Sequence, residues 1–167
     1  MKKLNIAIIG YKFMGKAHSN AWRKAPYFFD LNVEPVLKVA CGRHEASLKE
    51  LSNKLEASGI KNVKIIKGSE QVAVPFEKEY FDFFLLYDVF HLLDKKNREA
   101  VLSEAYRVLK KEGILSYHAT HIGSYDTNLE EVQQQIKMHG FRLKEEFRKP
   151  MFHWRWIAEG LVFNYGK

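Results

Sequence analysis

The sequence predicts a doubly wound α/β fold, in which helices cover both faces of a mostly parallel sheet. Short apolar segments alternate with segments of helical periodicity from residue 4 to about residue 140, and this alternation is typical of βαβ units. After Gly140 two β segments follow each other directly, which predicts an antiparallel pair at one edge of a seven-stranded sheet. Because 167 residues most simply form one domain, we expect a single domain over residues 1–167.

Five parallel strands are expected first. The run LNIAIIG at residues 4–10 is continuously apolar, as in parallel strands that are buried on both faces. The segment FDFFLLYDV at 81–89 has the same character. Three further strands are expected at 35–42, 63–68 and 113–120. The closing antiparallel pair is expected in FRLKEEF and WIAEGLVFNYG.

Apolar residues spaced three and four apart, together with capping residues, indicate the helices. We expect helices near residues 14–26, 44–59, 94–113 and 126–140. Asp94 can cap the start of the third helix and Gly113 its end, and Gly59 suits the end of the second. Thr127 and Glu130 have the spacing of a capping box. The expected buried side of the first helix consists of Met14, Ala17, Ala21 and Trp22.

Composition narrows the function classes. The net charge is +7, but the basic residues are spread along the chain and form no nucleic-acid-reading motif, so a solvated basic surface is the simplest interpretation. The single cysteine, Cys41, excludes a disulfide within the chain and fits a reducing cytoplasm. The apolar runs are too short for a signal peptide or a membrane span. We therefore expect a cytoplasmic protein with no nucleic-acid or membrane partner, and the oligomeric state stays open.

The first third of the chain resembles the glucose–fructose oxidoreductase and inositol dehydrogenase family. The resemblance is carried by IIGYKFMGKAHSNAW and by VACGR. It implies an NAD(P)-dependent oxidoreductase with a Rossmann domain, and it covers residues 1–56. The larger substrate domain and the E-K-P motif of that family are missing here, which argues against an oxidoreductase reaction.

The remainder, residues 57–167, resembles the second half of a class I S-adenosylmethionine-dependent methyltransferase. The segment VPFEKEYFDFFLLYDVFHLLDKKNREAVLSEAYRVLKKEGILS carries this resemblance. It implies a Rossmann-like three-layer fold with the strand order 3-2-1-4-5-7-6. With a junction expected near SNKLEASGIKNV, we interpret the chain as a chimera of these two families, engineered or otherwise. One divergent natural family is the alternative.

The stretch GYKFMG is the first candidate cofactor site. It joins the first strand to the first helix and consists of Gly10, Tyr11, Lys12, Phe13, Met14 and Gly15. The dinucleotide fingerprint has glycine where this chain has Lys12. A lysine there favours a phosphate-bearing ligand such as NADP over S-adenosylmethionine, whose sulfonium is a cation. The alternative is a plain strand–helix turn with an exposed lysine.

Two further cofactor positions follow the next strands. A carboxylate usually binds the ribose hydroxyls after the second strand, but here the tip reads Cys41-Gly42-Arg43-His44. Arg43 would suit the 2′-phosphate of NADP, unless it is only a surface residue. Ser69 and Glu70 occupy the place where methyltransferases often carry an acid for the adenine.

The fourth position is LLYDVFHLL. The methyltransferase resemblance implies that Asp88 and His91 lie beside the cofactor and the substrate, and such a pair could perform acid–base catalysis. Structural packing of His91 is the alternative. His118 and His121 have no cysteine or carboxylate near them in the sequence, so we expect no metal site. Residues 153–156 and Tyr125 could line an acceptor pocket, or could simply pack.

Each half thus lacks what its family requires. We infer a recombined Rossmann-like protein without evolved catalysis, with at most weak nucleotide binding. The alternatives are an S-adenosylmethionine-dependent methyltransferase with an atypical cofactor loop, and an NAD(P)-binding oxidoreductase fragment. The cofactor, if there is one, is NADP or S-adenosylmethionine.

Overall fold

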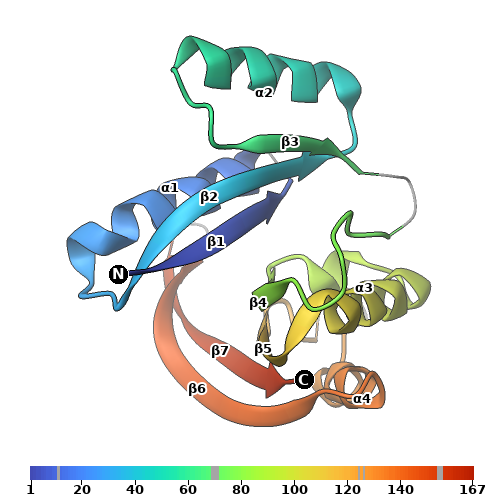
Figure 1. The fold of residues 1–167 in the computed structure, drawn as a ribbon. Coiled ribbons are helices and arrows are strands. Elements are labelled where there is room, and N and C mark those ends of the chain that lie inside the picture. The colour runs from blue at the N-terminus through green and yellow to red at the C-terminus, as the bar shows by residue number, and fades with distance from the viewer. Residues whose placement is uncertain (11, 69–71, 124, 126, 154–155) are drawn as a thin grey trace. The chain divides into compact units, whose positions relative to one another are not determined.

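The structure is a computed structural model, and the chain divides into two compact units, residues 1–71 and 72–167 (Figure 1). It describes residues 1–10, 12–68, 72–123, 125, 127–153 and 156–167, without the side chains of residues 14, 152, 153 and 156. The units are treated separately below. The expectation of one domain over the whole chain stays a prediction.

The first unit is a small parallel β-sheet with two helices. Its elements are β1 (Lys2–Ile9), α1 (Phe13–Phe28), β2 (Val33–Gly42), α2 (Glu45–Ala57) and β3 (Lys64–Lys67). The strands lie in the order β1-β2-β3, and both neighbouring pairs are parallel. All three strands lie where the sequence predicts them, because their apolar runs are bounded by turn residues.

The inward face of α1 differs from the prediction. Ala17 and Ala21 are exposed, whereas Gly15 is buried and Trp22 and Ala25 are half-buried. The observed inward face is therefore rotated from the predicted one by about one residue, or roughly 100° around the helix axis. The reason lies in the preceding turn, where Gly15 packs directly against the backbone of Gly10. This contact fixes which side of the helix faces β1 and β2. The side chain of Met14 lies outside the described residues.

The end of α2 follows the prediction. Gly59 has a left-handed backbone, with φ of 67°, and its N–H donates to the carbonyl of Glu56 at 2.9 Å. Glycine adopts this conformation without the cost that a Cβ adds. Leu48 of this helix is buried, and Leu51 and Leu55 are half-buried on the same side.

The second unit is an α/β layer pair with a mixed sheet. Its elements are β4 (Phe81–Tyr87), the 3₁₀ turn η1 (Phe90–Leu92), α3 (Lys95–Val108), β5 (Leu109–His118), α4 (Leu129–Met138), β6 (Arg142–His153) and β7 (Trp156–Gly166). The strand order is β4-β5-β7-β6. The β4–β5 pair is parallel, and β7 is antiparallel to both of its neighbours.

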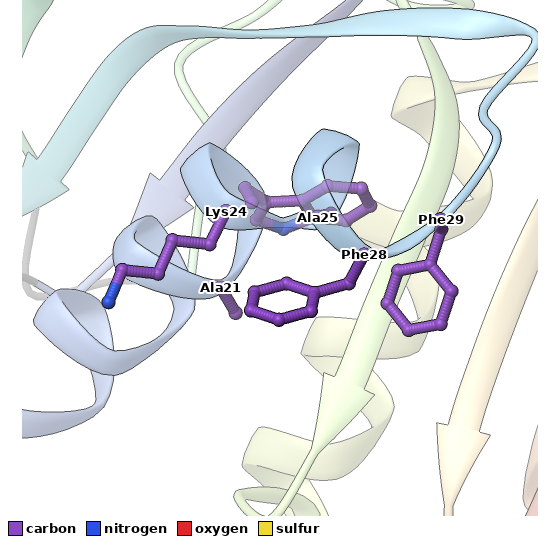
Figure 2. Close-up of a pocket in the computed structure, with 6 residues that line it drawn as sticks. Ala21, Lys24, Ala25, Phe28 and Phe29 are labelled. Carbon is purple, nitrogen blue, oxygen red and sulfur yellow. The ribbon is translucent and has the colours of Figure 1, made fainter.

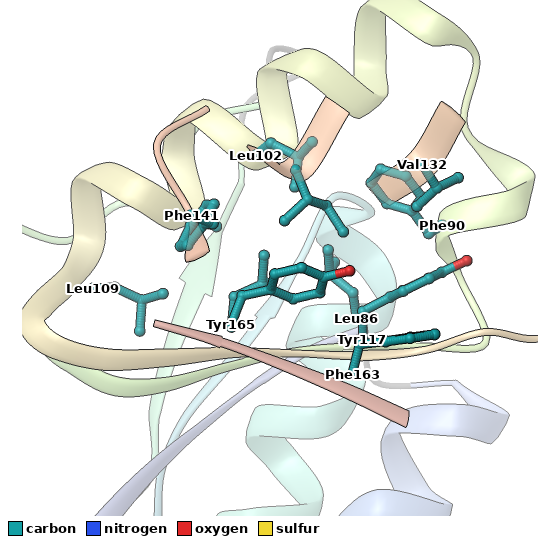
Figure 3. Packing of buried hydrophobic residues seen from close by; sticks show 12 residues of the cluster. Leu86, Phe90, Leu102, Leu109, Tyr117, Val132, Phe141, Phe163 and Tyr165 are labelled. Atoms are coloured by element: carbon teal, nitrogen blue, oxygen red, sulfur yellow. The ribbon is translucent and has the colours of Figure 1, made fainter. Parts of the chain in front are cut away.

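The core of this unit lies between α3, α4 and one face of the sheet (Figure 3). Leu102 and Val132 come from the helices, and Leu115, Tyr117 and Phe163 come from β5 and β7. Residues two apart on a strand share a face, so alternate residues of β5 and β7 meet the same two helices. The opposite face carries a chain of hydrogen bonds described below.

The boundary between α3 and β5 lies earlier than predicted. The helix ends at Val108, and Gly113 lies within β5 rather than capping the helix. Phe81 pairs with Leu109, whereas Phe83 pairs with Ile114, so β5 has three more residues than β4 between these pairs and its register is irregular there. Pairing with β4 therefore overrides the local helical pattern of VLKKEG.

The predicted capping residue is confirmed at the start of α3 and wrong at the start of α4. The carboxylate of Asp94 accepts a hydrogen bond from the N–H of Asn97 at 2.8 Å, which is the predicted cap of α3. The cap of α4 is Asn128, whose side chain accepts from Glu130 and Glu131. Thr127 does not cap, because its hydroxyl is buried against Arg98 and the carbonyl of Tyr125.

Within each unit the strand order agrees with the predicted order 3-2-1-4-5-7-6. A pairing of β1 with β4 is not among the strand pairs of the described residues. Residues 72–80 contain no helix. None of the helices that the structure describes has the length and apolar character needed to cross a membrane.

Candidate functional site

The first turn is built around two glycines. Gly10 has φ of 92°, a left-handed value, and its N–H donates to the carbonyl of Cys41 at 2.8 Å. A Cβ on Gly15 would lie 1.8 Å from the carbonyl oxygen of Gly10. Both positions therefore require glycine, and the turn brings the start of α1 close to the end of β1. Such turns allow a ligand to approach the backbone.

The other predicted residues of this turn are exposed where they are described. Lys12 is exposed and precedes α1, and its side chain makes no capping hydrogen bond. Phe13 is 76% exposed. Tyr11 lies outside the described residues, as does the side chain of Met14. The structure thus places Lys12 at the helix start, where its charge can turn into solvent.

The tip of β2 offers no carboxylate for a ribose. Arg43 is exposed between β2 and α2. The nearest acid, Glu45, accepts a hydrogen bond from Lys67 Nζ at 2.6 Å, and this contact lowers the pKa of the Glu45 carboxyl. Ser69 and Glu70, the predicted adenine site, lie outside the described residues.

Cys41 is a buried residue of β2 and not an exposed thiol. Burial raises the pKa of its thiol, so that the thiolate is disfavoured. We assign it no chemical role.

The ends of β4 and β5 bring three titratable side chains together. Asp88 follows β4, His91 lies in η1, and His121 follows β5. His121 Nε2 lies 3.4 Å from Asp88 Oδ1. The rings of His91 and His121 have centroids 4.3 Å apart. The ring of Tyr125 lies 5.1 Å from His91 and 5.5 Å from His121, on the same cluster.

Burial differs among the members of this Asp88–His91–His121 cluster. His91 is 8% exposed, while the side chains of His121 and Asp88 are 25% and 24% exposed. The Oδ1 atom of Asp88 is buried and accepts no hydrogen bond within the described part of the chain. The cluster is therefore partly shielded from water but open on the side of Asp88 and His121.

A buried arginine holds the turn that carries His91. Arg98 Nε donates to the carbonyl of Phe90 at 3.2 Å, and its Nη2 donates to Thr127 Oγ1 at 3.2 Å. The guanidinium also lies over the ring of Phe90, 5.5 Å from its centroid. These contacts connect η1 to the segment before α4.

The sequence analysis selected Asp88 and His91 as a pair but did not predict that His121 lies beside them. The signal was available, because β4 and β5 are parallel neighbours and the carboxyl ends of such strands lie at one edge of the sheet. Tyr87 pairs with His118 in the register, so the residues following each lie close together. The carboxylate absent near His121 in sequence is supplied by the fold.

A second feature is an apolar hollow on α1, with a volume of about 410 Å³ (Figure 2). It is lined by Ala21, Trp22, Lys24, Ala25, Phe28 and Phe29. In Figure 2 the ring of Phe28 extends toward Ala21, and the ammonium of Lys24 points away from it. This lining contains no group for acid–base catalysis, so the candidate site is the cluster at the β4 and β5 ends.

The fold and the comparisons with known proteins define the structural class of this protein. The protein has an α/β Rossmann-like fold of the methyltransferase type, with parallel strands and an antiparallel pair at the C-terminal end. Residues 36–117 match the family model described as a methyltransferase domain. No curated protein is a recognisable sequence relative of this chain.

Solved structures with this fold are numerous. An S-adenosylmethionine-dependent methyltransferase from Aquifex aeolicus is 17% identical with a TM-score of 0.61, covering 99% of this chain and 81% of its own. A TehB-like methyltransferase from Corynebacterium glutamicum is 15% identical with a TM-score of 0.66, covering 100% and 82%. A methyltransferase from Methanosarcina mazei is 15% identical with a TM-score of 0.62, covering 100% and 93%. At such identities these similarities establish the fold.

Proposed function

We propose that this protein binds S-adenosylmethionine and transfers its methyl group to a small acceptor. The observation that carries the proposal is the methyltransferase-domain match over residues 36–117, which runs from β2 to β5. The match begins well before the predicted junction near residues 52–63 and continues through it. It therefore supports one methyltransferase-type chain, and nothing in the comparisons supports an oxidoreductase segment or a chimera.

The glycine turn fits a nucleoside cofactor. Gly15 leaves no room for a Cβ beside the Gly10 carbonyl, and Gly10 needs its left-handed backbone. Residues of this turn would hold the cofactor through backbone contacts, which need no particular side chain at position 12. When bound, S-adenosylmethionine supplies an electrophilic methyl group on a sulfonium. The ammonium of Lys12 offers that cation no attraction, but its exposed position keeps it free to turn away.

The tip of β2 is the weaker part of the fit. The carboxylate of Glu45 is paired with Lys67, so it is not a free acceptor for the ribose hydroxyls. Arg43, two residues earlier, can only donate hydrogen bonds. We infer that the ribose hydroxyls are bound less tightly than in a site with a free acid there. NADP, which Arg43 would suit, has no support from the family match.

We assign Asp88 and His91 to the acceptor side of the site, as the resemblance to methyltransferases implies, and this assignment stays a prediction. Both follow β4, and in open α/β sheets ligands bind outside the carboxyl ends of the strands. Their use as an acid–base pair stays a prediction. The comparisons favour this methyltransferase proposal, an alternative of the sequence analysis, over the inactive recombined protein that we inferred first.

Calorimetric titration tests the proposal. We expect saturable binding of one S-adenosylmethionine, and of its demethylated product, per chain, with no binding of NADP or NAD. A ligand at 100 times its Kd should raise the unfolding free energy by about 2.7 kcal/mol. Binding of NADP without S-adenosylmethionine, or of neither, would contradict the proposal.

Location and reaction need separate measurements. Ultraviolet crosslinking of labelled S-adenosylmethionine should mark peptides around residues 10–16 or 88–91. Release of the demethylated product in the presence of small oxygen, nitrogen or sulfur acceptors reports turnover. Labelling confined to other peptides would place the cofactor elsewhere and contradict the assigned turn.

A further inference from the structure

We propose that Asp88, His91 and His121 form a binding site for one divalent transition-metal ion of the zinc class. Each residue offers one ligand atom, and the three atoms lie within 4.8 Å of one another. One carboxylate oxygen and two imidazole nitrogens are a ligand set that zinc accepts in proteins. This inference does not depend on the methyltransferase proposal.

The geometry is close to that of a bound ion. Two ligands that are each about 2.1 Å from a tetrahedral ion lie roughly 3.4 Å apart. His121 Nε2 and Asp88 Oδ1 are already 3.4 Å apart. The third atom, on His91, needs an approach of about 1.4 Å at most to reach the separation of a tetrahedral site, since all three atoms lie within 4.8 Å of one another. Side-chain rotation alone can provide a movement of that size.

The surroundings favour a cation. The buried Asp88 Oδ1 accepts no hydrogen bond within the described residues, and a buried carboxylate oxygen needs a partner because its hydration has been lost. Among the described residues, no lysine or arginine forms an ion pair with Asp88, and the contact at Oδ1 is His121 Nε2 at 3.4 Å, which is cationic only when the imidazole is protonated. A metal ion between Asp88 and the two imidazoles would compensate the carboxylate.

The backbone is strained where the ligands lie. Asp88 and His121 both have φ of 56°, and Tyr125 beside them has φ of 58°. These are three of the four left-handed residues other than glycine in the described part of the chain. Such conformations concentrate at sites that need a fixed side-chain geometry. Here they turn Asp88 and His121 toward each other after two parallel strands.

Ligand chemistry selects the metal class. Two nitrogens and one oxygen suit zinc, cobalt or nickel, whereas magnesium and calcium prefer oxygen ligands throughout. Three protein ligands leave one tetrahedral position open. An oxygen or sulfur atom of a small ligand bound there would lose its proton more readily, as water does on zinc.

The first test uses untagged protein treated with a chelator and then dialysed. Titration with Zn²⁺ against a chromophoric chelator should give one ion per chain with Kd of about 1 µM or below. Co²⁺ should give visible absorption bands with the intensity of a four- or five-coordinate site. A stoichiometry well below one, or a Co²⁺ spectrum of the hexa-aqua ion, would overturn the proposal.

Variants then identify the ligands. Asp88→Asn and His121→Asn keep residues that tolerate the left-handed backbone, and His91→Gln keeps a polar side chain. We expect each to weaken Zn²⁺ binding by at least tenfold. His44→Gln is the matched control, because His44 is exposed in the other unit; it should leave the affinity within twofold.

Two outcomes separate a metal site from packing of aromatic rings. If the three variants bind Zn²⁺ as the unaltered protein does, the cluster is packing only. If His44→Gln weakens binding equally, the ion is held by scattered surface histidines, and the proposal fails again. Circular dichroism and urea unfolding of each variant show that a loss of binding is not a loss of fold. S-adenosylmethionine is absent throughout, so failure here leaves the methyltransferase proposal standing.

Discussion

The hydroxyl of Ser116 donates a 2.7 Å hydrogen bond to the side-chain oxygen of Asn164, across the β5–β7 pair. Ser116 Oγ also lies 2.9 Å from the hydroxyl of Tyr87 on β4, and the amide of Asn164 donates to Glu145 on β6 at 3.1 Å. A single chain of hydrogen bonds thus crosses all four strands of the second unit. It lies on the face opposite the core helices.

Replacing Asn164 should break this chain in the middle. In Asn164→Ala, Ser116 and Glu145 both lose a partner, and Ser116 is buried. We expect a loss of about 1–2 kcal/mol in the free energy of unfolding, as for other partly buried hydrogen bonds. Urea unfolding measures it. A loss below about 0.5 kcal/mol would mean that water replaces both partners.

Gly15→Ala should disrupt the first unit. The added methyl group would stand 1.8 Å from the Gly10 carbonyl oxygen, and backbone must move to relieve that contact. We expect a destabilisation of about 3 kcal/mol, at the upper end of overpacking. Gly68→Ala is the control, because the nearest atom to its Cβ would be 3.6 Å away. Equal melting temperatures for the two variants would contradict the packing argument.

Leu102→Ala tests the core of the second unit. Leu102 is fully buried among residues of α4, β5 and β7 (Figure 3). Its truncation should cost about 2–5 kcal/mol, because it removes apolar burial and leaves a cavity. The matched Leu92→Ala, at a side chain that is 65% exposed, should cost below about 0.5 kcal/mol. Denaturant titration of both variants gives the comparison.

The pH dependence of stability should report on Glu104. Arg107 donates to its carboxylate at 2.7 and 2.8 Å, and this lowers the pKa of Glu104 below its ordinary value of 4.5. The N–H of Val74 also donates to that carboxylate, at 2.7 Å. A carboxyl with a lowered pKa stabilises the fold above its unfolded pKa, and this contribution disappears as the pH falls through the folded pKa.

Glu104→Gln therefore should be less stable than the unaltered protein at pH 7, by about 1 kcal/mol, and the difference should shrink below pH 4.5. Urea unfolding at intervals from pH 7 to pH 3 measures it. A constant difference over that range would show that charge on Glu104 contributes nothing.

The strands were predictable because local patterns and the tertiary structure agree there. The apolar runs of β1, β2, β4 and β5 and the caps at Asp94 and Gly59 are signals that a short stretch contains completely. The end of α3 could not be predicted in this way. The helical pattern continues to Gly113, but the pairing of Phe81 with Leu109 starts the strand earlier. Only the tertiary partner supplies that information.

The candidate site shows the same limit. Asp88 and His91 are close in sequence and were selected together, whereas His121 lies thirty residues further on. Only the parallel pairing of β4 and β5 makes these residues neighbours. The prediction of the inward face of α1 was wrong for a related reason. That face is set by one backbone contact between Gly15 and Gly10, and the spacing of apolar residues in the helix contains no information about this contact.

The position of β7 has a consequence for synthesis of the protein. This strand lies between β5 and β6 and buries Val162, Phe163 and Tyr165, although it is made after both of its neighbours. Until β7 has left the ribosome, the edge of β5 that pairs with it has unpaired backbone hydrogen-bonding groups, and the core lacks the side chains that β7 contributes. Nascent chains that end before residue 162 should therefore stay exposed to chaperones and to aggregation through that edge. Folding of the second unit therefore waits for the synthesis of β7.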